Sequence, residues 1–186
     1  MKQPGHIFGM VLTVGNYKER NMNPLERISK WFTRRECTRS EIAAREGIVN
    51  EPNDTQWVAI IFLMTNVMDK IRDLCGVAIR PTSVFRCKKV NTKAKGSKDS
   101  QHMRGEACDF LPLGWTVKDT MRLIIANNIP FDQLIDEYGA WVHISVKATG
   151  KNRGEICRFR KVYNPQTKKT ETVKTYLTRE QVLNAA

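Results

Sequence analysis

The chain has 186 residues, of which 41% are hydrophobic and 27% are charged. These values are typical of soluble globular proteins and exclude an intrinsically disordered chain. The length predicts one domain with its own core and room for a small appendage. The formal net charge of +12 favours an anionic partner, such as nucleic acid, a membrane surface or an anionic cell-wall polymer.

Cysteine usage and the N-terminal residues indicate how the protein is made. The cysteines are odd in number and form no C-x-x-C pair, which predicts reduced thiols: Cys37, Cys75, Cys87, Cys108 and Cys157. The apolar run at residues 7–12 is too short to span a bilayer, and we expect a strand there. No cleavage site follows this run, so we expect synthesis in a cytoplasm without a signal peptide.

Two helices are predicted in the N-terminal half of the chain. A short helix capped by Thr38 or Ser40 ends at Gly47. The longest helix begins at residues 53–54, because apolar residues then recur at the spacing of one buried helical face. Gly76 closes it.

The central part of the chain is predicted to contain short strands. Residues 77–79 and 82–85 resemble two strand pieces interrupted by a proline. Residues 91–99 are predicted to form a polar loop rich in lysine. Residues 107–111 are apolar around Asp109 and predict a short buried strand whose carboxylate needs a partner.

The following segment predicts a helix and a hairpin. Thr116 caps a helix over residues 116–127. Residues 133–137 and 141–146 are expected to pair across a short connection that contains glycine. This hairpin presents His143.

The C-terminal segment carries most of the excess positive charge. Residues 156–163 and 170–176 predict a second hairpin, and a final helix begins at Thr178 with the pattern of a capping box. Helices and hairpins together predict an α+β fold, with helices packed on a mostly antiparallel sheet.

Two histidines and one aspartate form the most informative group in the sequence. His102 and Asp109 flank Gly105, which permits a sharp reversal that could bring both side chains to one point, and His143 lies on the hairpin. Two imidazoles and one carboxylate suit a zinc ion that keeps one position open for water. A non-haem iron triad uses the same ligand types, but the close His-x-Asp step that we associate with it is absent.

Four segments carry a resemblance to a known family. The pattern S-x-H-x-x-G-x-A-x-D is formed by Ser100, His102, Gly105, Ala107 and Asp109. The other segments are Trp141-Val142-His143, Ser83-Val84-Phe85-Arg86 with Asn91, and a lead-in of Phe32, Glu36, Ser40, Ala43, Gly47, Asn50 and Pro52. Together they resemble the zinc peptidases of peptidoglycan, of the D-Ala-D-Ala carboxypeptidase-like type, particularly the members found in bacteriophages.

The resemblance implies a hedgehog/D-Ala-D-Ala-peptidase-like fold and a role for several residues. It assigns residues 31–147 to a zinc peptidase domain, with residues 1–30 as an N-terminal extension. Residues 148–186 would be a basic C-terminal extension packed on the same domain. The zinc ligands would be His102, Asp109 and His143, and Arg86 would bind the developing oxyanion. A guanidinium suits that role, although a surface salt bridge is the alternative for Arg86.

The general base is the point at which the chain departs from the family. Many members carry a carboxylate three residues before the last histidine, and this chain has Ala140 there. Asp136 and Glu137 are the nearest upstream acids, and either could reach the metal from the end of its strand. We choose Glu137 because its side chain is longer and it lies nearer the strand end.

Two further residues have open interpretations, and a third is assigned to the core. Ser100 either supports the site by a hydrogen bond and contacts substrate, or is an ordinary turn residue. Trp141 either lines the substrate groove or covers the hairpin. Strand alternation turns Cys108 away from Asp109 and into the core.

The leading hypothesis is a zinc-dependent peptidase that acts on peptidoglycan stem peptides, as an endopeptidase or a D-alanyl carboxypeptidase. By the resemblance, it would be a phage lytic or virion-borne enzyme that is made in the host cytoplasm and acts at the cell wall, with other virion proteins as further partners. The alternative is a catalytically weak wall-binding or structural phage module that retains the metal site. Charge alone supports a nucleic-acid partner, which we do not expect.

Overall fold

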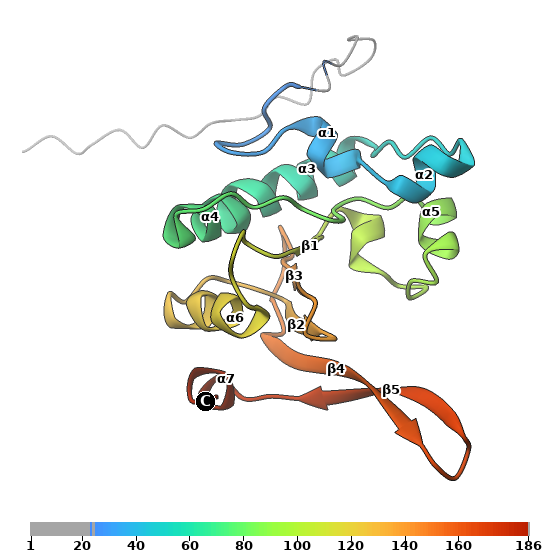
Figure 1. The fold of residues 1–186 in the computed structure, drawn as a ribbon. Coiled ribbons are helices and arrows are strands. Elements are labelled where there is room, and N and C mark those ends of the chain that lie inside the picture. Colours follow the sequence, from blue (N-terminus) through green and yellow to red (C-terminus); the bar gives the residue numbers. More distant parts are fainter. Residues whose placement is uncertain (1–22, 24, 186) are drawn as a thin grey trace, which may run out of the picture.

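The computed structural model describes residue 23 and residues 25–185. Helices pack against a five-stranded sheet whose strand order is β1-β3-β2-β4-β5 (Figure 1). The predicted α+β class is therefore confirmed. The strand predicted for residues 7–12 lies outside the described residues.

The N-terminal half forms a helical layer. The predicted long helix is confirmed as a continuous run of α3 (Asp54–Leu63), a π-helical turn (Met64–Met68) and α4 (Asp69–Cys75). Asn53 caps its start, and Gly76 ends it in the left-handed conformation. The predicted short helix is α2 (Glu41–Glu46), capped by Ser40 and ended by Gly47.

Helix α1 (Arg34–Thr38) was not predicted, although the sequence contains its start signal. Thr33 and Glu36 form a reciprocal capping box, in which each side chain accepts a hydrogen bond from the backbone N–H of the other residue. The T-x-x-E pattern was the available signal, but the helix is too short to show an apolar period.

Two predictions for the central segment are wrong. Residues 77–79 and 82–85 form only isolated bridges, Ile79 with Pro112 and Ser83 with Asp109. The proline between them removes a backbone donor and prevents a longer ladder. The expected loop at 91–99 is helical at its start, because α5 (Lys88–Lys93) runs into it. A 3-10 helix (Gln101–Arg104) follows.

The sheet is mostly antiparallel. Strand β1 (Ala107–Phe110) pairs with β3 (Trp141–Ser145), which forms the predicted hairpin with β2 (Gln133–Glu137). Strand β4 (Glu155–Asn164) adds to β2 in parallel and forms the second predicted hairpin with β5 (Lys169–Tyr176). The C-terminal segment thus extends the sheet that carries His143.

One face of the sheet packs into the core. Helix α6 (Val117–Ala126), capped by Thr116 as predicted, contacts this sheet and α7 (Arg179–Leu183), whose capping box at Thr178 is confirmed. Cys108 is fully buried in this core, on the face opposite Asp109, as strand alternation predicts. All five cysteines lie in the described part of the chain and are free thiols.

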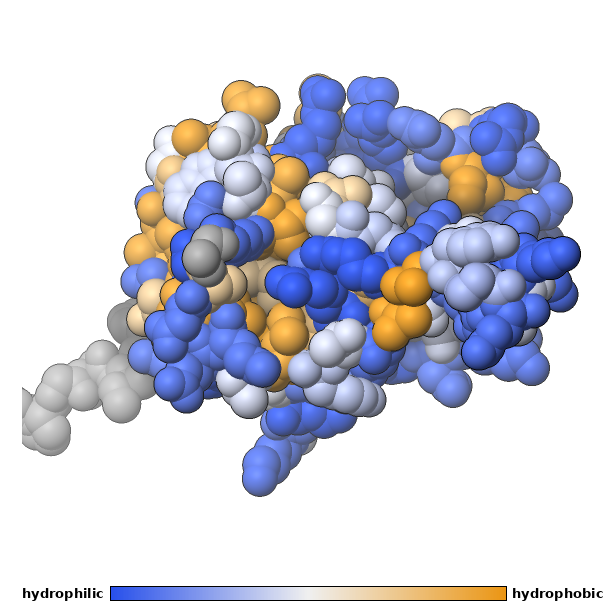
Figure 2. Space-filling model, turned by 60° about the horizontal axis from the view of Figure 1, so that its bottom comes forward, coloured by the Kyte–Doolittle hydropathy of each residue, from blue (hydrophilic) through white to orange (hydrophobic). Residues whose placement is uncertain are grey.

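The β4–β5 hairpin projects from the end of the molecule opposite the N-terminal helical layer (Figure 1). Every residue of β5 is exposed, and hydrophilic residues cover most of the molecular face that Figure 2 displays. Across residues 25–185, the helices are all too short or too polar to cross a membrane.

The glycine that ends the 3-10 helix is predicted to contribute to the stability of the fold. Gly105 ends the 3-10 helix at a φ of +74°, and a Cβ there would lie 2.6 Å from the backbone oxygen of Gln56. Both the left-handed conformation and the collision oppose a side chain. We expect Gly105→Ala to lower the free energy of unfolding by about 1–3 kcal/mol in urea denaturation.

Gly114→Ala is the control for the positive φ alone, since nothing lies within 4 Å of its Cβ position. Equal losses in both variants would contradict the role of the close contact.

Candidate metal centre

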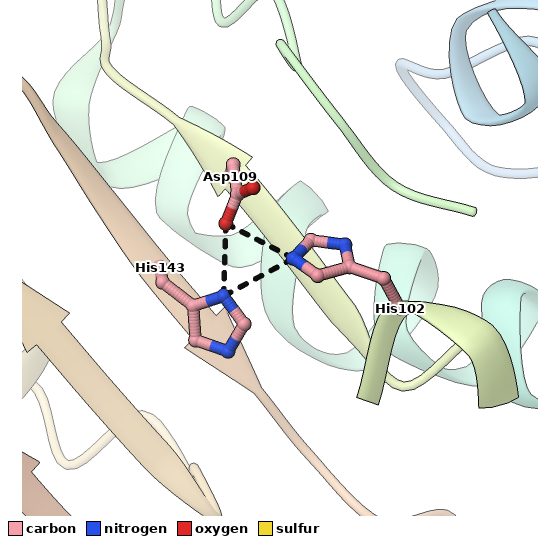
Figure 3. Close-up of side chains that lie close together, drawn as sticks. All are labelled: His102, Asp109 and His143. Carbon is pink, nitrogen blue, oxygen red and sulfur yellow. Dashed lines mark hydrogen bonds and ion pairs between the residues drawn. The ribbon is translucent and has the colours of Figure 1, made fainter. Parts of the chain in front are cut away.

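Three side chains from three elements converge on one point (Figure 3). The Nε2 atom of His102 lies 3.2 Å from Oδ1 of Asp109 and 3.2 Å from Nδ1 of His143. The Nδ1 atom of His143 lies 2.8 Å from the same Oδ1 atom. All three residues are buried, and no other group of three or more histidines, cysteines and acids in the described residues clusters in this way.

The sheet register brings two of these residues together. Asp109 on β1 is the direct partner of His143 on β3, so their side chains leave the same face of the sheet. Four hydrogen bonds hold the Asp109 backbone to residues 82–83. The carbonyl oxygen of Asp109 accepts from Thr82 N at 2.8 Å, Thr82 Oγ1 at 3.0 Å and Ser83 N at 3.4 Å, and its N–H donates to Ser83 O at 2.8 Å. The carboxylate is therefore fixed at the edge strand.

A backbone carbonyl orients the third residue. The Nδ1 atom of His102 lies 2.7 Å from the carbonyl oxygen of Val84, which can only accept a hydrogen bond. The proton of the neutral ring therefore resides on Nδ1, and the lone pair of Nε2 faces Asp109 and His143. Metal-binding histidines are commonly held by a hydrogen bond of this kind.

The charge states match a metal-binding donor set. Burial lowers the pKa of His102 and so favours the neutral imidazole. Burial alone would raise the pKa of Asp109, but its interactions with His102 and His143 outweigh that effect and hold the pKa far below its usual range. The cluster therefore offers the ionised carboxylate of Asp109 and the neutral imidazole of His102.

The spacing of the donor atoms also fits zinc. A tetrahedral zinc ion with bonds of about 2.0–2.1 Å places its ligand atoms about 3.3 Å apart. The three separations here, 2.8–3.2 Å, are close to this value. Three protein ligands leave a fourth position for water, as in hydrolytic zinc sites.

Arg86 contacts the ligand carboxylate. Its Nη2 atom donates to Oδ2 of Asp109 at 3.3 Å, while Oδ1 faces the histidines. The alternative of a surface salt bridge does not describe this pair, because the side chains are only 18% and 11% exposed. The Nε atom of Arg86 is buried without a hydrogen-bond partner among the described residues.

Asn50 holds the segment that carries Arg86. Its amide nitrogen donates to Phe85 O at 3.0 Å and to Thr38 O at 2.8 Å, and its oxygen accepts from Cys87 N at 2.7 Å. These bonds connect the N-terminal helices to the two neighbours of Arg86 in the chain. Asn50 belongs to the lead-in segment that carries the family resemblance, but nothing in the sequence around it indicated this positioning role.

The two candidate bases point in different directions. Asp136 is bound by Arg158 and Arg160 and accepts a hydrogen bond from Gly139 N at 2.8 Å. Glu137 lies on the other face of β2, where it lines the same cavity as the three clustered residues. Burial raises the pKa of Glu137, and the negative charge of Asp109 adds to this effect. Of these two acids, only Glu137 therefore lines the cavity that contains the cluster.

An open cavity of about 880 Å³ surrounds the cluster. Its walls include the clustered residues, Arg86 and Glu137, as well as Ser100 and Trp141, which were predicted to contact substrate. Ser100 uses its backbone carbonyl to accept a hydrogen bond from Met103 N. Trp141 is the strand partner of Glu137 across β2 and β3, and its side chain is half-buried.

Comparison with known proteins agrees with this geometry. A search of curated proteins finds no match to the chain. A model of the family described as Peptidase M15 matches residues 30–145, which is more than half of the chain and contains all the clustered residues. Members of this family are zinc peptidases. The chain therefore belongs to the Peptidase M15 family.

Proposed function

We propose that this protein is a zinc-dependent peptidase that hydrolyses peptide bonds in peptidoglycan stem peptides, as an endopeptidase or a D-alanyl carboxypeptidase. The observation that carries the proposal is the triangle of His102 Nε2, Asp109 Oδ1 and His143 Nδ1 in the wall of an open cavity. Membership of a zinc peptidase family supports the reaction class.

The side chains around the triangle have complementary tasks in peptide hydrolysis. A bound zinc ion would polarise the scissile carbonyl and acidify a water, which supplies the nucleophile at neutral pH. Glu137 takes the proton from that water and delivers it to the leaving amine. Burial shifts the pKa of Glu137 upward, toward neutral pH, which suits a group that must both accept and donate a proton.

Arg86 stabilises negative charge on the oxygen of the attacked carbonyl. Its Nη2 contact with Asp109 and its position in the cavity wall place a guanidinium beside the triangle. A preorganised cationic donor of this kind acts most strongly when charge develops in the transition state. Asn50 keeps this donor in place through the backbone on either side of it.

The cell wall as substrate is supported by charge. The chain carries 31 lysines and arginines against 19 acids, and cell walls and their attached polymers carry carboxylates and phosphates. A phage lytic or virion-borne enzyme acts on such a polymer, and the proposal assigns the protein to this class. Its partners would be peptidoglycan and, in a particle, other virion proteins.

Ala140 favours one alternative function. It stands where many relatives carry the catalytic carboxylate, so the protein could be a wall-binding module with a metal site and little activity. Zymography on purified cell walls, with and without a chelator, separates the two functions. We expect a clearing zone that the chelator abolishes and zinc restores. Wall binding without clearing in the zinc-loaded protein would support the module.

A further inference from the structure

A second charged cluster lies in the wall of the same cavity. Asp132 is fully buried, directly before β2, and both of its oxygens are saturated with donors. Oδ1 accepts from Arg153 N at 2.9 Å and contacts Lys147 Nζ at 3.1 Å. Oδ2 accepts from Gln101 Nε2 at 2.9 Å, from Arg153 Nε at 2.8 Å and from Arg153 Nη2.

This cluster has more positive than negative charge. Two cations share one carboxylate, and Glu155, an acid on the neighbouring strand, is itself paired with Lys174 at 2.9 Å. The side chain of Lys147 is 33% exposed and that of Arg153 is 48% exposed, whereas Asp132 is inaccessible. A ligand in the cavity therefore meets the cations and not the acid that holds them.

Both cations retain unused donors. The guanidinium of Arg153 has five N–H groups. The Nε–H group and one N–H group of Nη2 donate to Asp132, and the others do not. The ammonium of Lys147 has three, directed in part to Asp132 Oδ1 and to Lys151 O at 3.3 Å. Positively charged donors that are already fixed in place bind an anion with little further loss of side-chain entropy.

The cations lie at the end of the cavity away from the proposed base. Asp132, which holds both cations, directly precedes β2, and on that strand Ile135 pairs with His143 and Glu137 pairs with Trp141. At about 3.3 Å per residue, Asp132 lies roughly 10 Å of backbone from the level of His143 and roughly 16 Å from Glu137. The metal triangle therefore lies between Glu137 at one end and the two cations at the other, within the length of a short extended peptide.

We propose that Lys147 and Arg153 form a subsite for a carboxylate of the peptide substrate, held in register by the buried Asp132. This inference rests on the proposed function and specifies its substrate: a peptide with a free carboxylate a few residues from the cleaved bond. Both residues follow residue 145, where the match to the family ends, so the subsite belongs to the chain's own C-terminal segment.

The test compares soluble peptidoglycan fragments with free carboxylates and the same fragments after carbodiimide-coupled amidation. Binding is measured by calorimetry at physiological salt to the zinc-loaded Glu137→Gln variant, so that hydrolysis does not consume the ligand. We expect the free fragments to bind about tenfold more tightly, the gain typical of one charge-assisted hydrogen bond. Equal binding of both fragments would overturn the proposal.

Three substitutions in the same background locate the effect. Lys147→Met is expected to remove most of the tenfold preference, and Lys147→Arg to retain it. The matched control is Lys70→Met, which removes the same charge from an exposed position on α4. A preference that survives in Lys147→Met, or that falls equally in Lys70→Met, would contradict the subsite.

Hydrolysis by the zinc-loaded wild-type protein is measured separately on both fragments. Cleavage of neither fragment would refute the proposed peptidase activity, while the binding preference would still test the subsite. Cleavage of both fragments with equal kcat/KM would leave the peptidase intact and refute the subsite.

Discussion

Replacement of His102 by alanine is expected to abolish both zinc binding and peptide hydrolysis. The residue is buried and supplies one of the three donor atoms, and its ring is oriented by Val84 O. Loss of a mere hydrogen-bond partner of a metal ligand typically costs 10- to 100-fold in affinity or activity, so loss of the ligand itself is expected to exceed about 100-fold. Metal analysis of the purified variant and a peptidoglycan digestion assay measure the two effects.

The matched control for this variant is His6→Ala, which removes the remaining histidine of the chain. It is expected to retain zinc and activity. A His102→Ala protein that is folded by circular dichroism and still binds one zinc ion would contradict the assigned ligand set. Full activity after removal of the metal would contradict the reaction class as well.

Replacement of Glu137 by glutamine is expected to lower kcat by about 10²- to 10⁴-fold, the usual contribution of a general acid–base group. Zinc content is expected to stay unchanged, because Glu137 is not one of the three clustered donors. The amide retains the size of the side chain but cannot accept the proton of water. Steady-state kinetics on wall fragments, with metal analysis of the same sample, measure this separation.

Asp136→Asn is the neighbouring control. Asp136 is held by Arg158 and Arg160 on the other face of β2, so this variant is expected to lose about 1–3 kcal/mol of stability with little change in kcat. Near-normal cleavage by zinc-loaded Glu137→Gln would remove Glu137 from the mechanism. A large loss of kcat in Asp136→Asn alone would move the role of the base to that residue.

The sequence predicted the elements whose pattern is local. The helix from Asp54 to Cys75 has a long apolar period and clear caps, and the β2–β3 hairpin has a glycine-containing turn. The isolated bridges at Ile79 and Ser83 were predicted as strands, because β-branched composition does not reveal how many partners a segment finds in space. Helix α5 was hidden by its lysines, which are equally common in polar loops.

The sequence predicted side chains of the site better than the contacts that position them. The histidines and Asp109 stood out by residue type and spacing, as did the two candidate bases. The bond of His102 to Val84 O spans 18 residues and involves a carbonyl that every residue possesses, so no pattern marks it. Asp132 and Arg153 are 21 residues apart and meet only because β4 adds to β2.

The most direct test of the central claim joins metal analysis with mass spectrometry of digested peptidoglycan. The account predicts one zinc ion per chain and stem-peptide products that carry a newly formed amine and a newly formed carboxylate. These products should disappear with a chelator and return with added zinc. A protein that binds no stoichiometric metal, or products that are unaffected by chelation, would contradict the claim that this chain is a zinc peptidase.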